Sequence, residues 1–473
     1  MLVLLFFGVN LFLSFATDTY FTFAMGFEYS ALDMTTRNGR PIIGLIYQLK
    51  YLIGLSDISF YYISSVLALI FLGISIFIYQ RILEKYEIKE NVRILLAFAG
   101  IANIFIIEYF MFLEKCGFML AILFDVIGVY WIEKFFSTRD KKSFFLCTLF
   151  ITLAIFTYQG TIALFVILSI PFAMKQAKDF KQYLLNGVAL GIVYLIPALI
   201  DLLAFKFVFD GSRIATEVNY IEKIENVILG IYRYGQETFH ILPNYVYLLI
   251  SVIIFVALVI GAVAGNRKVW RIFNAFIIII ASCVFSTATI LQGSGGFAVR
   301  IVYPLASIAA TLAIDIFVNG SEIQQICIKK CTQYISMISI CVLLAFQYFA
   351  FNRIYINKYQ VNALDEYRYQ FIYQAISEYQ ESTGTEVTKI AFYRDAEESN
   401  PQYSDLYCEG DLVVSALTRD WSDTRAMNYY LHTNYERISP TEEYTKYFSQ
   451  KNWNSLSEEQ LIFDGDTLHV CVY

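Results

Sequence analysis

Residues 244–264 read NYVYLLISVIIFVALVIGAVA, a run of 21 residues without a charged side chain. The hydrocarbon core of a bilayer is about 30 Å thick and a helix rises about 1.5 Å per residue, so about 20 apolar residues cross it. Arg267 and Lys268 follow the run closely, as is typical of a loop at the membrane surface. This stretch therefore predicts a transmembrane helix.

Ten further stretches are apolar enough to cross a membrane, which gives about eleven predicted spans. They lie at 1–16, 59–80, 94–112, 117–133, 143–158, 161–174, 184–204, 272–292, 301–319 and 333–351. The composition agrees, because 58% of the residues are apolar and 16% are charged, against about 45–50% and 25% in soluble domains. This composition excludes an enzyme that is soluble throughout. Mild acidity without a basic block argues against nucleic acid as a partner.

The distribution of charge divides the chain into two predicted domains. Residues 1–351 carry a net charge of +4, and residues 352–473 carry −10 and contain no long apolar run. About 120 residues are enough for a small core of their own. Alternating patterns predict helices at 359–381 and 423–431 and strands at 388–393, 412–415 and 468–473. We expect a polytopic helical membrane domain over 1–351 and a small α/β accessory domain over 352–473.

Loop charges predict the orientation of the spans, because Lys and Arg accumulate in cytoplasmic loops. With eleven spans, the five basic loops all fall on one side of the membrane. These loops are 81–93, 134–142, 175–181, 267–271 and 329–330. We therefore expect a multi-pass protein of the plasma membrane with a cytoplasmic N-terminus and an extracytoplasmic C-terminal domain.

The predicted outer loops mix acids with bases, and the first of them is about 40 residues long. Asp18 directly follows the first span, and Glu28 and Asp33 come later in the same loop. The position of Asp18 would hold a carboxylate at the membrane surface, and a polar residue at the lipid headgroups is the alternative explanation for it.

Three arginines on the same predicted side are candidates for binding a phosphate group. Arg37 and Arg40 come just before a helix that Pro41 is suited to begin, and Arg300 follows a glycine-rich turn. Guanidinium groups bind phosphate through paired hydrogen bonds, and a helix start favours anions. Ordinary contact with lipid headgroups is the alternative. The pattern of apolar residues over 42–53 predicts an amphipathic helix, lying either on the membrane surface or against the bundle.

Two short outer turns add polar pairs to this face, Glu114-Lys115 and Tyr158-Gln159. Asp201, near the end of a span, is also expected to face outward. Metal and nucleotide motifs are missing from the sequence. The three histidines are far apart, no Cys-x-x-Cys pair occurs, and there is no phosphate-binding glycine loop. We expect no cofactor and no protein-bound metal site, with a divalent cation as an open alternative.

Four short segments together resemble the serotype-converting glucosyltransferase family, which are polytopic membrane glycosyltransferases of the GT-C type. The segments are Thr17-Asp18-Thr19-Tyr20, Arg37-Asn-Gly-Arg40-Pro41, Tyr158-Gln159 and Arg300-Ile-Val-Tyr-Pro304. The resemblance covers most of residues 1–350 and none of the C-terminal part. The family often has two adjacent acids after the first span, whereas here Thr19 follows Asp18. The resemblance therefore implies Asp18 as the catalytic base, with Glu28 and Asp33 as alternatives.

The resemblance implies transfer of a hexose, with glucose the expected one, from a polyprenyl-phosphate donor to an envelope glycan on the outer face. Donor phosphate would be held by basic side chains, and inversion at the anomeric carbon is expected. The implied phosphate-binding residues are Arg37, Arg40, Arg300 and Lys115, and the implied acceptor- or sugar-binding residues are Tyr158, Gln159 and Glu114. Membrane lipid is the remaining expected partner.

Other classes of protein remain as alternatives to an enzyme of this kind. A transporter of lipid-linked oligosaccharides, or a structural subunit of an envelope-polymer assembly, is the main one. A transporter commonly shows internal repeats and charges at the membrane midplane, whereas this sequence concentrates its charge in loops. A polymerase or an O-acyltransferase is a further alternative; an acyltransferase would need a histidine in the membrane domain, where only His240 is present.

Overall fold

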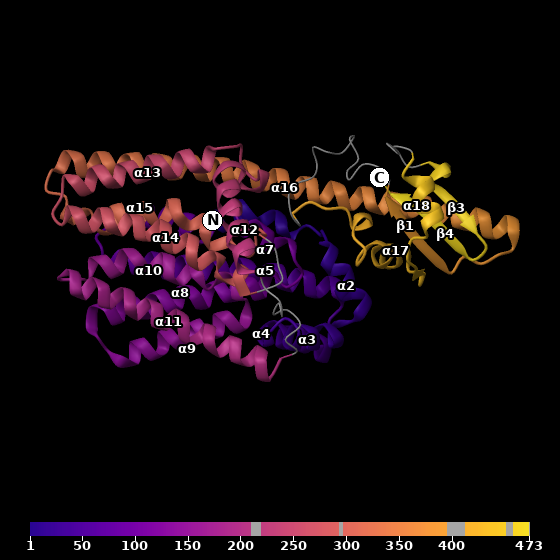
Figure 1. The fold of residues 1–473 in the computed structure, drawn as a ribbon, viewed down its shortest axis with the longest axis horizontal. Helices are drawn as coiled ribbons and strands as arrows, with labels where there is room; N and C mark the ends of the chain where they lie inside the picture. Colours follow the sequence, from indigo (N-terminus) through magenta and orange to yellow (C-terminus); the bar gives the residue numbers. More distant parts are fainter. Residues whose placement is uncertain (210–218, 293–296, 395–411, 451–456, 473) are drawn as a thin grey trace. The chain divides into compact units, whose positions relative to one another are not determined.

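A computed structural model describes residues 1–209, 219–292, 297–394, 412–450 and 457–472 of the chain. The described elements are mostly helices, and the strands lie near the C-terminus (Figure 1). The chain divides into two compact units. Unit 1 comprises Met1–Leu11, Glu28–Phe110 and Glu114–Phe351, and unit 2 comprises Phe12–Phe27, Met111–Leu113 and Asn352–Tyr473. Unit 2 therefore contains a segment from near the N-terminus as well as the C-terminal part of the chain.

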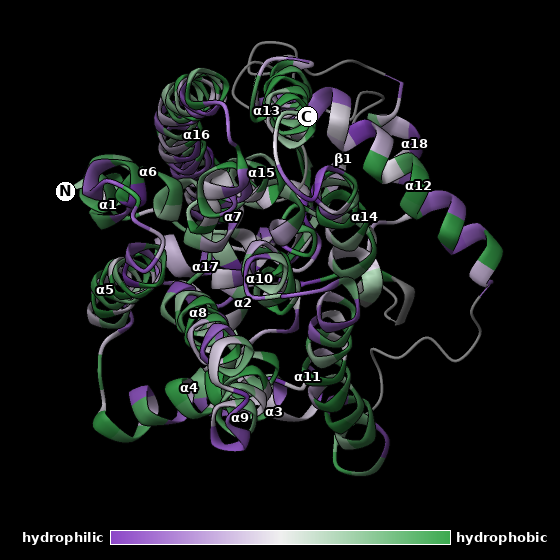
Figure 2. Ribbon diagram, turned by 90° about the vertical axis from the view of Figure 1, so that its left-hand side faces the viewer, coloured by the Kyte–Doolittle hydropathy of each residue, from purple (hydrophilic) through white to green (hydrophobic). Residues whose placement is uncertain are grey.

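Unit 1 is a helical bundle. Six described helices are long and apolar enough to cross a membrane: α5 (Asp57–Glu84), α8 (Lys115–Thr138), α11 (Phe180–Phe207), α13 (Val246–Val263), α14 (Lys268–Gln292) and α16 (Ile326–Thr383). In Figure 2, the visible turns of α5 and α13 are coloured mostly as hydrophobic. The shorter helices are α1 (Leu2–Phe7), α3 (Phe27–Thr36), α4 (Pro41–Ile53), α6 (Glu90–Ile101), α7 (Ile106–Met111), α9 (Lys141–Thr157), α10 (Ala163–Lys175), α12 (Tyr220–Glu237) and α15 (Ile308–Val318). The chain is thus a helical membrane protein.

The other five predicted spans form helices that are shorter or interrupted, so six of the eleven predicted spans are confirmed as long apolar helices among the described residues. The stretch 94–112 shows why, because α6 ends at Ile101 and α7 begins at Ile106. Asn103 lies in the break and is buried; its amide donates to Ser307 Oγ at 2.9 Å, and its carbonyl accepts from the backbone of Phe105. A buried asparagine that satisfies the freed backbone in this way interrupts a helix without leaving polar groups unpaired.

The five basic loops of the sequence meet at one end of unit 1. Arg139, after α8, donates to Asn186 of α11, and Arg267, between α13 and α14, donates to the carbonyl of Ala177 after α10. Lys85, after α5, pairs with Glu133 near the end of α8. Lys175 likewise reaches Ser321, in the connection between α15 and α16. These contacts place the basic loops together at one end of the bundle.

Helix α4 packs one face on the bundle and leaves another exposed. Ile43 and Tyr47 are fully buried, and a Cβ on Gly117 of α8 would come within 2.8 Å of Ile43, so the two helices are in contact. Leu45, Leu49, Leu52 and Ile53 are exposed. Exposed apolar side chains at this spacing are suited to the boundary between headgroups and acyl chains. The predicted packing of this helix against the bundle is confirmed for one face, and contact of the other face with the membrane surface stays a prediction.

Unit 2 contains a four-stranded sheet of order β2-β1-β4-β3, with β1 (Lys389–Arg394), β2 (Glu436–Arg437), β3 (Leu461–Asp464) and β4 (Thr467–Val472). Strand β1 is parallel to β2 and β4, and β3 is antiparallel to β4. The helices α17 (Asp423–Leu431) and α18 (Glu442–Phe448) complete the alternation of helices and strands. The predicted strand at 412–415 is wrong, because Ser415 instead donates to the buried carboxylate of Asp365 and caps a 3-10 turn.

The segment before α3 belongs to unit 2 through aromatic contacts. Helix α2 (Thr17–Met25) lies against α17: the ring of Phe23 stacks on that of Tyr429 with centroids 4.9 Å apart. The hydroxyls of Tyr20 and Tyr430 are 2.9 Å apart, and the backbone of Phe15 donates to Asn362. Burial of such side chains stabilises a small domain strongly. The C-terminal part of the chain therefore provides the packing surface of α2.

Candidate functional site

Three of the four segments that carry the family resemblance meet in unit 1. They are the turn that ends at Arg40, the turn of Tyr158 and Gln159 between α9 and α10, and the segment that begins at Arg300. They are separated by more than 100 residues from one another in the sequence, and the bundle brings them together. We call this group the Arg40 cluster.

The guanidinium of Arg40 is held by neutral neighbours on two sides. Its centre lies 4.5 Å from the centroid of the Tyr158 ring, and Nε is 3.5 Å from Gln159 Oε1. Gln159 also donates to the carbonyl of Gly39 at 3.0 Å, which fixes the turn beneath the arginine. Stacking on an aromatic face orients a guanidinium and leaves its edge for hydrogen bonds. A guanidinium fixed in this way is suited to binding an oxyanion.

Gly39 allows the close approach on which this arrangement depends. Its φ is +63°, and a Cβ there would lie 2.2 Å from the ring of Phe205 on α11. A side chain at this position is therefore disfavoured both by backbone conformation and by space. The Gly39 carbonyl can accept from Gln159 only if Phe205 of α11 packs directly against the backbone of Gly39.

We expect Gly39→Ala to destabilise unit 1 and to weaken any function of Arg40. Positive φ and overpacking together are expected to cost about 1–3 kcal/mol in the free energy of unfolding. Thermal unfolding in detergent measures this change. The matched control is Gly187→Ala, because Gly187 is helical and its Cβ would meet nothing within 4 Å; this control should unfold at or above the wild-type temperature. Equal midpoints for both variants would show that the turn tolerates a side chain.

Arg300 is fixed by a buried acid. One guanidinium nitrogen lies 2.7 Å from Oε1 of Glu108, which is 1% exposed, and the backbone N–H of Arg300 donates to the same carboxylate. The hydroxyl of Tyr109 donates to the Arg300 carbonyl at 2.7 Å, and the Tyr109 ring packs edge-on to Tyr158. Tyr109 therefore links Arg300 to Tyr158 of the cluster. The buried carboxylate compensates much of the charge of Arg300.

Asp201 is the cluster residue to which sequence analysis assigned no role. It lies on α11, is 8% exposed, interacts with the side chain of Gln159 and is close enough to Arg40 for a Coulombic interaction. Sequence analysis indicated only that it faces outward. Its position near the end of a span was the available signal, but nothing in the sequence pairs it with Arg40.

Glu114 and Lys115 lie at the start of α8 and contact α4 and α5. The hydroxyl of Tyr47 donates to Glu114 at 2.9 Å. The Lys115 ammonium is fully buried and lies 3.9 Å from the centroid of the Tyr61 ring. Both residues are inside the bundle, in contact with α4 and α5. Their contacts fix the position of α4, whose first turn follows Arg40.

The acids of the first predicted outer loop are not gathered at the Arg40 cluster. Asp33 accepts from Asn38 at 2.8 Å and lies 3.5 Å from Arg37, whose side chain is 53% exposed. This places the Asp33–Arg37 pair at the end of α3. Glu28 is exposed and hydrogen-bonds to Tyr51 of α4, which raises the pKa of that phenol. An open cavity of about 700 Å³ between α3 and α4 is lined by Glu28, Thr35 and Gln48 with apolar side chains.

Asp18 lies in unit 2, in the first turn of α2. One of its carboxylate oxygens accepts from the indole N–H of Trp421 at 3.0 Å. Arg425 fixes this neighbourhood, because it donates to the Trp421 carbonyl and its guanidinium lies 4.7 Å from the centroid of Phe21. The start of α2 and the indole N–H both place hydrogen-bond donors near this carboxylate and so fix its position.

The residues that the structure describes contain no group of three His, Cys, Asp or Glu side chains that could hold a metal ion. Comparison with known proteins adds no assignment: no family model matches the chain. No curated protein matches it either. The interpretation of the site therefore rests on its own geometry.

Proposed function

We propose that the chain is a membrane glycosyltransferase that moves a hexose, with glucose the expected one, from a polyprenyl-phosphate donor to an envelope glycan on the extracytoplasmic face. The observation that supports this proposal best is the Arg40 cluster. Segments that carry the family resemblance converge there, although more than 100 residues separate them in the sequence. If the short segments resembled the family by chance, there would be no reason for them to lie together in the fold.

Arg40 would bind the donor phosphate in this proposal. Its guanidinium is stacked and oriented, and it would make charge-assisted hydrogen bonds with phosphate oxygens. Arg300 would contribute less, because Glu108 already neutralises it. Arg37 and Lys115 are held elsewhere, the first beside Asp33 and the second over Tyr61. Tyr158 is 2% exposed, so its ring would position Arg40 rather than bind sugar directly.

The reaction needs a base and a stabilised leaving group. The acceptor hydroxyl would attack the anomeric carbon from the face opposite the phosphate, and its proton would pass to a carboxylate. The bond between the anomeric carbon and the phosphate oxygen would break, which inverts the anomeric configuration. Negative charge would build up on the polyprenyl phosphate, where Arg40 would stabilise it. Asp18 is the proposed base, and Asp201 would orient Arg40 and Gln159.

Transfer can be measured directly. Membranes containing the protein are incubated with a radiolabelled polyprenyl-phosphate hexose and an envelope glycan acceptor, and label in the glycan is followed over time. Label should enter the glycan with wild-type protein and remain in the lipid fraction with the double variant Asp18→Asn/Arg40→Ala. Movement of labelled lipid across the bilayer without transfer would instead support the transporter alternative.

The proposed orientation predicts opposite accessibility for two positions. In a variant without native cysteines, Asp140→Cys in a basic loop should react with a membrane-impermeant maleimide only after cells are permeabilised. Ser449→Cys in unit 2, an exposed position, should react in intact cells. The expectation follows from the accumulation of Lys and Arg in cytoplasmic loops. If Asp140→Cys reacted in intact cells and Ser449→Cys only after permeabilisation, the predicted orientation would be reversed. The Arg40 cluster and the donor would then lie on opposite sides of the membrane, and the proposal would be wrong.

A further inference from the structure

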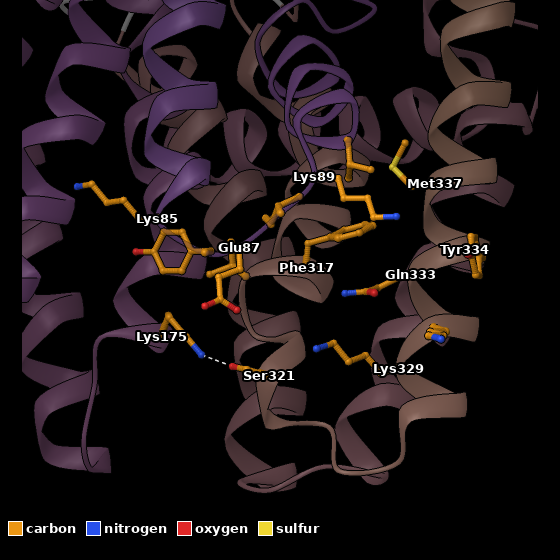
Figure 3. A pocket seen from close by; sticks show the side chains of 15 residues that line it. Lys85, Glu87, Lys89, Lys175, Phe317, Ser321, Lys329, Gln333, Tyr334 and Met337 are labelled. Atoms are coloured by element: carbon orange, nitrogen blue, oxygen red, sulfur yellow. Dashed lines mark hydrogen bonds between the residues drawn. The ribbon is translucent and has the colours of Figure 1, made fainter.

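A second polar region of unit 1 lies at the far end of α10 from the Arg40 cluster. It is a cavity of about 530 Å³, which five lysines from several elements line: Lys85, Lys89, Lys175, Lys329 and Lys330 (Figure 3). We call it the lysine cavity. The 13 residues of α10 separate it from Tyr158 and Gln159, which corresponds to about 20 Å along the helix axis. It is therefore a separate site.

The positive charge of the lysine cavity is only partly compensated. Lys85 pairs with Glu133, a carboxylate that also accepts from Tyr86 at 2.9 Å. Lys175 donates to Ser321 and lies 4.0 Å from Glu322. Glu87 is the acidic residue among the described lining side chains.

Three of these lysines have no acidic partner in the part of the chain that the structure describes. For Lys89, Lys329 and Lys330, no carboxylate lies within salt-bridge distance among the residues that the structure describes. Figure 3 shows Lys175 and Lys329 reaching toward the centre of the cavity, with the Gln333 amide nearby. Like charges held close together repel each other, and an anion between them relieves that repulsion.

Five of the other lining side chains are apolar. Phe317 and Val318 at the end of α15 and Met337 of α16 line the cavity, together with Ile88 and Val92 from the start of α6. Apolar side chains of this kind pack favourably against an acyl chain. A site that combines cations with apolar side chains matches a lipid with a charged headgroup.

We propose that the lysine cavity binds a phosphate group, and that its apolar lining favours a phosphate carried by an anionic lipid over inorganic phosphate. The lysines of α16 and of the connection before α6 bind the phosphate oxygens, and Gln333 donates a further hydrogen bond. The bound lipid holds α5, α10 and α16 together where their basic loops would otherwise repel. This proposal does not depend on the glycosyltransferase function.

The test measures binding of defined probes to the purified full chain in detergent. Phosphatidylglycerol, phosphatidylcholine and inorganic phosphate are added separately, and bound molecules are counted by native mass spectrometry, with affinities from titration. Phosphatidylglycerol should bind at least tenfold more tightly than phosphatidylcholine. Inorganic phosphate binding as tightly as phosphatidylglycerol would show that free phosphate is the ligand. Equal affinity for the two lipids would overturn the proposal.

The variant Lys329→Gln/Lys330→Gln should lower phosphatidylglycerol affinity about 25-fold, since each lysine near a lipid surface contributes about fivefold. Among the described residues, these two side chains have no acidic partner to lose, so the variant should still fold. Lys89→Glu tests a third position of the cavity and should also lower phosphatidylglycerol affinity. The matched control is Lys141→Gln/Lys142→Gln, two exposed lysines outside the cavity. Equal losses in the control would show non-specific charge attraction and overturn the proposal. Arg40→Ala should leave this affinity unchanged, which separates the site from the proposed donor site.

Discussion

Replacement of Arg40 by alanine is expected to weaken both donor binding and turnover. A hydrogen bond to a charged group contributes about 1.5–3 kcal/mol, so donor affinity should fall about 10- to 150-fold. Turnover should fall as well, because the leaving phosphate carries more charge in the transition state than in the bound donor. Titration of the polyprenyl-phosphate hexose and single-turnover transfer in membranes measure the two effects.

Two further arginine variants make this test specific. Arg40→Lys should recover only part of the loss, because an ammonium can neither stack on Tyr158 as a plane nor bind phosphate with two parallel donors. Arg81→Ala is the matched control, since Arg81 is 58% exposed and pairs with Glu84 on the same helix; exposed pairs of this kind contribute little. Unchanged donor affinity in Arg40→Ala would show that Arg40 does not bind the donor and would favour the alternative that it contacts lipid headgroups.

Replacement of Asp18 by asparagine is expected to have the larger effect on turnover. Asparagine keeps the size of the side chain and can still accept from the indole of Trp421, but it cannot take a proton. Loss of a general base lowers the rate about 10²–10⁴-fold. Donor affinity should be unchanged, because the base acts on the acceptor hydroxyl. Rates at saturating donor, with variants expressed at the wild-type level, separate this outcome from a binding defect.

Asp201 and Trp421 provide the comparisons that test the assignment of the base. Asp201→Asn removes a negative charge near Arg40, so donor phosphate should bind at least as tightly as in the wild type while turnover falls less than in Asp18→Asn. Trp421→Phe removes one donor to Asp18 and should cost about tenfold in rate. A severe loss in Asp201→Asn with near-normal turnover in Asp18→Asn would make Asp201 the base. Normal turnover in both would direct the search to Glu28 and Asp33.

The packing of α2 on α17 affects how the C-terminal part can be studied. Tyr429 and Tyr430 cover Phe23 and Tyr20, so deleting the C-terminal part would expose aromatic side chains of the segment that carries Asp18. Loss of transfer after such a deletion would therefore not distinguish a catalytic domain from a supporting one. Point variants such as Trp421→Phe avoid this difficulty because they preserve the aromatic packing.

The sequence by itself determined the class of protein and the position of many elements. Long apolar runs predicted the six helices that are long enough to cross a membrane, and the alternating pattern near the C-terminus predicted β1, β4 and the bounds Asp423–Leu431 of α17. These are local properties, because partition into a bilayer and helix or strand periodicity depend on residues that are neighbours in the chain. The predicted strand at 412–415 is wrong because Ser415 donates a hydrogen bond to Asp365, a residue 50 positions away in the sequence.

Only the tertiary structure decided which polar residues meet. Gly39 and Gln159, or Glu108 and Arg300, are separated by more than 100 residues, and no periodic signal connects such pairs. The same holds for Asn103, whose buried amide interrupts a predicted span by bonding to Ser307. Hydrogen bonds and ion pairs act over a few ångströms, so their partners are set by how helices pack rather than by composition. The assignment of Asp18 to unit 2, beside Trp421, was likewise decided by the packing of aromatic side chains that are 400 residues apart.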